Sequence, residues 1–90
     1  MPTPSTYLDG NSVAGPLGAL LGFDITTSVG ICAGCHTRAV MARGRVYSTG
    51  PGLVLRCADC DHVLVRLVVA SNQAWLDMSG LASLQIEHRG

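Results

Sequence analysis

The sequence contains no lysine, and charged residues of all kinds make up only 13% of its 90 residues. Six arginines balance six acidic side chains, so the formal net charge at pH 7 is zero. Proteins that bind nucleic acids or anionic membranes without specificity draw most of their affinity from an excess of Lys and Arg. The balance of charges therefore argues against both kinds of binding protein.

Aromatic residues are also scarce, at 4% of the chain, although hydrophobic residues as a whole reach 48%. This composition is too apolar and too weakly charged for a disordered chain, and the length suits one domain. A domain of this size buries only about 60 to 65% of the surface that its unfolded chain exposes. Apolar side chains are therefore expected to stay exposed unless a partner covers them.

The sequence lacks a hydrophobic run long enough to cross a membrane. The longest stretch without a charged residue, Gly10 to Phe23, contains several Gly and a Pro. It falls short of the roughly 20 apolar residues that a membrane-spanning helix needs. The first ten residues carry no basic side chain, unlike the start of a signal peptide. These features predict a cytoplasmic location, where thiols stay reduced.

Apolar residues at helical spacing predict one short helix near the N-terminus. Four apolar side chains between residues 13 and 21 would share one face, and Gly22 suits the left-handed conformation that often ends a helix. Pro16 would shorten or bend this helix, because it lacks a backbone N–H. Residues 1–7 are predicted to be a flexible arm, and residues 8–88 a single domain. The candidate N-cap residues are Asp9, Asn11 and Ser12.

After the helix, β-branched residues, alternating patterns and turn residues predict antiparallel strands. The turn Gly50-Pro51-Gly52 would join two of them in a hairpin. The clearest strand, His62–Ala70, has one wholly apolar face and one mixed face. The predicted strands are Ile25–Ile31, Val40–Tyr47, Leu53–Cys57, His62–Ala70, Ala74–Met78 and Leu81–Ile86.

Two identical Cys-x-x-Cys motifs contain all the cysteines and lie on either side of the predicted hairpin. Two residues between the thiols let a tight turn aim both sulfurs at one point, while backbone N–H groups of the turn donate to the thiolates. Two such turns complete a tetrahedron, and four protein ligands leave no position open for water. The spacing predicts one structural Zn²⁺ per chain. Its ligands would be Cys32, Cys35, Cys57 and Cys60.

Three other chemistries compete for these cysteines. Iron can occupy the same tetrahedron, as in rubredoxin, although the second motif lacks the Pro and Gly typical of rubredoxins. A redox-active pair is a second alternative, but a matched pair of motifs suits it badly. Cys32 to His36 also fits the Cys-x-x-Cys-His pattern of covalent haem attachment. Haem attachment requires export and an apolar haem pocket, which this sequence does not indicate.

Histidines and arginines follow or precede the two motifs closely. His36 and His62 are predicted to be exposed residues or hydrogen-bond donors near the site, since the four thiolates already complete the ligand set. A zinc ion with four thiolates carries a net charge of −2, which nearby cations would offset. Arg38 and Arg56 are the candidates for this role.

Support for nucleic-acid binding or catalysis is limited. Arg43, Arg45 and Tyr47 would form a weak basic patch on one strand face, which is more typical of a solvated sheet edge than of a nucleic-acid interface.

The chain has no paired carboxylates, and a closed metal site cannot activate water. Asp77 is predicted to cap a turn, and Trp75 to be a core residue or an interface anchor. The sequence therefore predicts a protein that is not an enzyme.

The chain resembles a family of small uncharacterised actinobacterial proteins that are regarded as zinc-ribbon-like and have no assigned activity. The resemblance covers about residues 7 to 87 and implies that the four cysteines are the ligands of a zinc ribbon. Genes of this family often lie beside those of flavin- or molybdenum-dependent oxidoreductases, which implies an accessory role. The residues that carry the resemblance are Leu8-Asp9-Gly10-Asn11, Gly22-Phe23-Asp24, the two Cys-x-x-Cys motifs, Gly52 to Cys57 and Trp75-Leu76-Asp77.

Together these features predict a small α+β fold, with an N-terminal helix packed on an antiparallel zinc-ribbon β-sheet. The expected function is a zinc-binding, non-enzymatic accessory or protein-interaction module, which would belong to a larger redox assembly if the resemblance holds. The alternative is a nucleic-acid-associated zinc ribbon in transcription or translation. Because Val54, Leu64 and Val68 lie on the mixed sheet face, another protein chain is expected to cover that face, either a second copy or a member of a larger complex.

Overall fold

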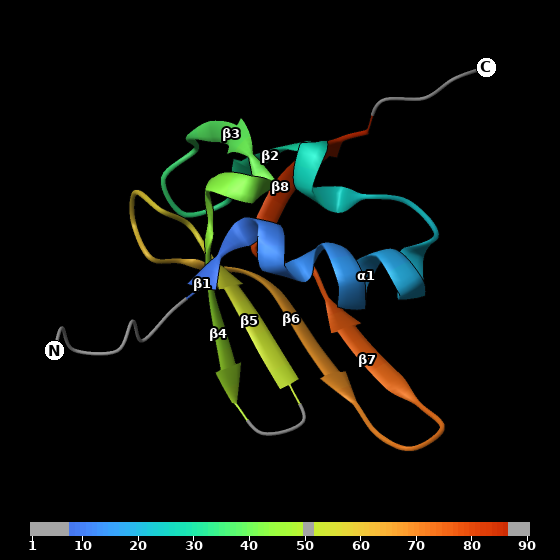
Figure 1. The fold of residues 1–90 in the computed structure, drawn as a ribbon. Helices are drawn as coiled ribbons and strands as arrows, with labels where there is room; N and C mark the ends of the chain where they lie inside the picture. Colours follow the sequence, from blue (N-terminus) through green and yellow to red (C-terminus); the bar gives the residue numbers. More distant parts are fainter. Residues whose placement is uncertain (1–7, 50–51, 87–90) are drawn as a thin grey trace, which may run out of the picture.

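A computed structural model describes residues 8–49 and 52–86 as one helix packed on two antiparallel sheets (Figure 1). The predicted arm at residues 1–7 lies outside the described residues, as do Gly50 and Pro51 of the predicted turn. The first sheet has the strand order β1-β4-β5-β6-β7, and the second has the order β3-β2-β8. The strands are β1 (Leu8–Asp9), β2 (Val29–Cys32), β3 (Arg38–Val40), β4 (Arg45–Thr49), β5 (Gly52–Arg56), β6 (Val63–Val69), β7 (Ala74–Asp77) and β8 (Leu81–Gln85).

The predicted helix is present as a 3₁₀ turn, η1 (Gly10–Val13), that continues into α1 (Ala14–Leu21). Gly22 ends it in the left-handed conformation, with φ of 80°, and its N–H donates to the carbonyl of Gly18. Pro16 lies in the first turn of α1, where a missing N–H costs little. None of the candidate N-caps takes the cap position of α1: Val13 occupies it in a helical conformation without a side-chain hydrogen bond, because η1 leads directly into the helix.

The hairpins expected from the sequence are confirmed. Strands β4 and β5 pair from Arg45 with Arg56 to Thr49 with Gly52, so the chain reverses between Thr49 and Gly52. Strand β7 pairs antiparallel with β6, with Val68 opposite Trp75. The last strand, β8, does not extend this sheet but pairs with β2 in the second sheet. The small α+β class is therefore confirmed, whereas the single sheet of the prediction is replaced by two.

Two of the predicted strands are interrupted by 3₁₀ turns. Ile25–Thr27 forms η2, because the Asp24 carboxylate accepts hydrogen bonds from the backbone N–H and the hydroxyl of Thr26, at 2.9 and 2.6 Å. Met41–Arg43 forms η3, which carries the chain from β3 in one sheet to β4 in the other. An alternating pattern cannot signal such a crossing, since each half of Val40–Tyr47 is compatible with an extended strand.

The core lies between α1 and the five-stranded sheet. Leu17 of the helix and Leu55, Val65 and Leu67 of the sheet are all buried. Leu64 is also buried, which corrects its predicted place on the open face. The pairing of β5 with β6 shifts between Leu55 and Arg56, and this bulge turns Leu64 inward beside Val65. The remaining buried apolar residues are Val13, Ile25, Cys32, Met41, Val46 and Cys57.

Candidate metal centre

The two Cys-x-x-Cys motifs form turns with the same backbone hydrogen bonds. In the first, the N–H of Cys32 donates to the carbonyl of Thr37 at 3.0 Å, and the N–H of His36 donates to the carbonyl of Cys32 at 2.8 Å. In the second, the N–H of Cys57 donates to the backbone carbonyl of His62 at 2.8 Å, and the N–H of Asp61 donates to the carbonyl of Cys57 at 2.9 Å. We call residues 32–37 the first knuckle and residues 57–62 the second knuckle.

The knuckles belong to different sheets. The first knuckle connects β2 to β3 in the three-stranded sheet, and the second connects β5 to β6 in the five-stranded sheet. They also pack directly on each other, because a Cβ added at Gly34 would lie 3.1 Å from the ring of His62. A metal bound by both knuckles would therefore join the two sheets.

All four thiol sulfurs converge between the knuckles, within 4.8 Å of one another. The Sγ atoms of Cys32 and Cys60 are 3.6 Å apart, and those of Cys35 and Cys57 are 3.7 Å apart. With Zn–S distances of about 2.3 Å, a regular tetrahedron of sulfurs has edges of about 3.8 Å. The sulfur arrangement thus fits a tetrahedral metal ion, and it is too open for a disulfide, whose sulfurs are about 2.05 Å apart.

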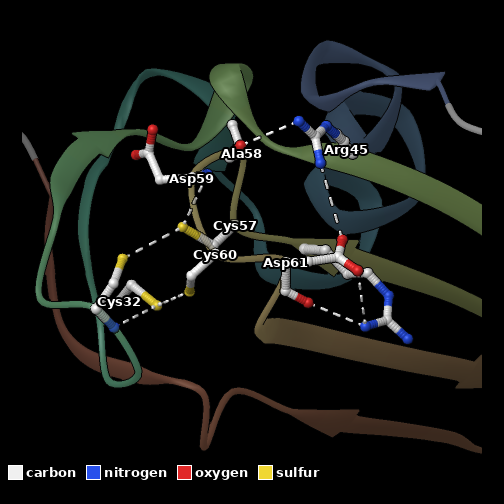
Figure 2. Close-up of polar contacts among 9 residues, drawn as sticks. Cys32, Arg45, Cys57, Ala58, Asp59, Cys60 and Asp61 are labelled. Carbon is white, nitrogen blue, oxygen red and sulfur yellow. Dashed lines mark hydrogen bonds and ion pairs between the residues drawn. The ribbon is translucent and has the colours of Figure 1, made fainter.

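Backbone N–H groups of the knuckles point at the sulfurs, as the spacing predicts. The Sγ of Cys32 accepts from the N–H groups of Gly34 and Cys35, at 3.3 and 3.5 Å. In the second knuckle the Sγ of Cys57 accepts from the N–H of Asp59 at 3.4 Å (Figure 2). These donors stabilise negative charge on sulfur, which favours the thiolate form that binds metal.

Two of the thiols, those of Cys35 and Cys60, have pKa values shifted in opposite directions by their neighbours. The Thr37 side chain, whose hydroxyl lies 3.2 Å from the Sγ of Cys35, lowers the pKa of Cys35 to about 6. At Cys60 a hydrogen bond from the His62 backbone lowers the pKa, but desolvation and the other three sulfurs raise it to about 12. A divalent cation would stabilise negative charge on both sulfurs, so we expect metal affinity to fall as the pH falls.

Two arginines hold the second knuckle in place. Arg45 donates to the carbonyl of Ala58 at 3.0 Å (Figure 2). Arg56 donates to the carbonyl of Asp61 at 2.9 Å. Both guanidinium groups also approach the Asp61 carboxylate, at 3.9 and 3.7 Å. Arg56 thus lies beside the site as predicted. The role of Arg45 was missed, although the register set by a two-residue turn at 50–51 would have placed it opposite Arg56.

The other predicted neighbours lie farther from this arrangement. Arg38 donates to the side chain of Gln85 in strand β8 of its own three-stranded sheet and not to a knuckle carbonyl. His36 is exposed, as expected, and His62 is exposed but packs over Gly34. The Asp77 carboxylate accepts the N–H of Ser79 at 2.8 Å, which confirms it as a turn cap.

The residues after each second cysteine have the positive φ that favours glycine. His36 has φ of 63° and Asp61 has φ of 65°. This conformation costs a typical side-chain-bearing residue about 1–2 kcal/mol. We therefore expect His36→Gly to raise the free energy of unfolding by about 0.5–1 kcal/mol, after allowing for the greater freedom of Gly in the unfolded chain. Urea unfolding of the zinc-loaded protein measures this change.

Asp61→Gly is the matched control for this prediction. It relieves the same backbone conformation but removes the carboxylate that faces Arg45 and Arg56, so its gain should be smaller than that of His36→Gly. A loss of stability in His36→Gly would contradict the strain that the positive φ implies.

The described residues thus define a small α+β protein with a four-cysteine, metal-compatible site between two sheets. The chain belongs to a family of unknown function, DUF6510, whose model matches residues 3–89. No curated protein and no solved structure gives a significant match to it. Among the described residues, no helix has the length and apolar character needed to cross a membrane.

Proposed function

We propose that this protein is a non-enzymatic accessory and interaction module, folded around one structural zinc ion in a zinc-ribbon-like site. The convergence of the four sulfurs within 4.8 Å of one another, with two pairs at 3.6 and 3.7 Å, carries the proposal. Four thiolates would complete the coordination of zinc and leave no position for a reacting water or substrate. A structural role for the metal follows from such a closed site.

The position of the knuckles explains what the metal would do for the fold. Zinc would crosslink the β2–β3 connection to the β5–β6 connection and so fix the two small sheets relative to each other. Structural zinc contributes on the order of 10 kcal/mol of apparent binding free energy, which is comparable with the whole stability of a small domain. Folding and metal binding should therefore be strongly linked in this protein.

Exposed apolar side chains support the interaction role. Trp75 is 55% exposed and Val69 is 50% exposed, both at the free end of the β6–β7 hairpin. Trp is enriched among the residues that dominate the binding energy of protein interfaces. The other large exposed apolar residues among those described are Leu20, Val40 and Ile86. We propose another protein chain as the partner, in keeping with the accessory role that the family resemblance implies.

The alternative function, a nucleic-acid-associated zinc ribbon, gains less support from the arginines. It depended on Arg43, Arg45 and Tyr47 as an open basic patch. Arg45 instead holds the second knuckle, and the guanidinium of Arg56 lies over the ring of Tyr47, 5.7 Å from its centre. Binding of this kind would weaken steeply as salt is added, which distinguishes it from an apolar protein contact.

The proposal is tested by purifying the full chain at low salt under reducing conditions and measuring its metal content and its co-purifying chains. We expect one zinc per chain and a retained partner or self-association that survives moderate salt. Iron in the same sulfur set would change the metal assignment, since both metals accept this geometry. A chain without metal that is fully folded would contradict the structural role.

A further inference from the structure

Strand β7 is an edge strand of the five-stranded sheet (Figure 1). In an antiparallel edge strand the backbone hydrogen-bonding groups point alternately to the neighbouring strand, here β6, and to the open side. The N–H of Ala70 donates to the carbonyl of Gln73 at 2.8 Å, so these two opposite residues are a hydrogen-bonded pair. Antiparallel pairs alternate, so Trp75 and Asp77 also bond to β6. The backbone groups of Ala74 and Leu76 therefore point away from the sheet.

The side chains of β7 alternate in the other direction, between the core and the open sheet face. Leu76 packs against the core cluster, so its neighbour Trp75 projects from the opposite face. On that face Trp75 lies opposite the half-buried Val68 of β6. The sheet thus ends in an apolar pair of side chains directly beside the outward backbone groups of Ala74 and Leu76, which pair with no other strand of residues 8–49 and 52–86.

We propose that β7 pairs antiparallel with β7 of a second copy of this chain, about a twofold axis that passes beside Trp75. In this register Ala74 of each copy exchanges both backbone hydrogen bonds with Leu76 of the other. The two Trp75 side chains then form a non-hydrogen-bonded pair, the closer kind of cross-strand neighbour. This proposal names the partner of the interaction role proposed above.

The side chains on the open face match across this axis. Across the axis the side chains would lie in the order Val68 and Trp75 of one copy, then Trp75 and Val68 of the other. They would form one apolar row across four strands. Gln73 of each copy faces Asp77 of the other, so an amide donor meets a carboxylate acceptor. An exposed apolar edge strand without a partner is otherwise a site of aggregation, and closed pairing removes it.

A register with the axis moved by one residue, so that it is centred on Leu76, shifts the pairing by two residues and is less favourable. It would pair Ala74 with Met78, but the carbonyl of Met78 already accepts the N–H of Leu81 at 3.1 Å. It would also place Asp77 opposite the apolar ring of Trp75. The register with its axis beside Trp75 pairs only residues of the regular strand and of the turn that precedes it.

The interface would be small, because it joins two short strands and a few side chains. Interfaces below about 1,200 Å² usually belong to weak or transient complexes. We therefore expect a dissociation constant on the order of 10–100 µM, which requires concentrated protein to observe.

Trp75 is the single tryptophan of the chain, so its fluorescence reports directly on this contact. The full-length, zinc-loaded protein is examined from about 1 µM to 1 mM by sedimentation velocity and intrinsic fluorescence, with metal content measured on the same sample. We expect a monomer–dimer transition and a blue shift of the Trp75 emission over the same range. A monomer with unchanged emission at 1 mM would overturn the self-pairing, whereas zinc loss alone would overturn the metal site.

Ala74→Pro tests the backbone pairing, because it removes an N–H that points away from β6. Dimerisation should weaken at least tenfold in Ala74→Pro and remain in Ala74→Ser, which keeps the N–H. Val40→Thr, in the other sheet, controls for the loss of an exposed apolar side chain and should leave the dimer unchanged. Equal dimerisation of Ala74→Pro and wild type would contradict pairing through β7.

Cysteine crosslinking tests the register even if Ala74→Pro fails to fold. A non-hydrogen-bonded pair has its Cα atoms about 4.5 Å apart, within the range of a disulfide. With zinc bound, Trp75→Cys should form a disulfide-linked dimer on mild oxidation, and Gln73→Cys should not, because each Gln73 faces Asp77. Crosslinking of Gln73→Cys in preference to Trp75→Cys would overturn the proposed axis.

Discussion

Cys57→Ser is expected to lower the apparent zinc affinity by at least about 100-fold and to unfold both knuckles. Loss of an outer-shell partner alone typically costs 10- to 100-fold in affinity, so loss of a ligand should cost more. Cys57 is 6% exposed, and its sulfur accepts the Asp59 N–H that shapes the turn. Metal content and a two-dimensional NMR amide spectrum of the purified variant measure both effects.

Ala58→Ser controls for the new hydroxyl in the same knuckle. Only the backbone carbonyl of Ala58 is used, by Arg45, so this variant should keep its zinc and its spectrum. A Cys57→Ser protein that is zinc-free but gives the spectrum of the folded wild type would show that the site is not structural.

Gly80→Ala is expected to destabilise the protein by about 3 kcal/mol or more, the upper range for added bulk in a packed site. A Cβ at Gly80 would lie 1.7 Å from the carbonyl oxygen of Val63, where backbone would have to move. The Gly80 carbonyl also accepts the N–H of Ala33 at 2.9 Å. Gly80 thus contacts both the first knuckle, through this hydrogen bond, and the start of β6, through its packing against Val63. Thermal unfolding of the zinc-loaded protein should show a fall in Tm of about 10–20 °C.

Gly15→Ala is the matched control for Gly80→Ala. A Cβ at Gly15, in α1, meets no atom within 4 Å. Ala is the better helix former, so this variant should be more stable than wild type by roughly 0.5–1 kcal/mol. A Gly80→Ala protein as stable as wild type would contradict the close packing of the two sheets at this position.

Local patterns predicted those parts of the fold that depend on neighbouring residues. Gly22 ends the helix, the chain reverses between Thr49 and Gly52, and β6 pairs with β7, each as expected. The β4–β5 hairpin returns the start of the second knuckle to the end of η3, which contributes to bringing the four cysteines together. Such features follow from turn chemistry and spacing, which a single sequence contains.

Features that depend on distant packing could not be predicted. The second sheet exists because β8 pairs with β2, and no local pattern specifies that partner. Leu64 is buried through a bulge of the backbone, which an alternating pattern cannot reveal. Nothing in the local sequence distinguishes Gly80 from an ordinary turn glycine, because its close approach to the Val63 carbonyl comes from the packing of the two sheets. Long-range contacts of this kind decide how the knuckles are held together.

X-ray absorption at the zinc edge is the most direct test of a structural zinc held by all four cysteines. For the protein purified with its metal, we predict four sulfur neighbours at about 2.3 Å and no nitrogen or oxygen neighbour. Histidine or water in the coordination shell would contradict the closed site on which the proposed structural role depends.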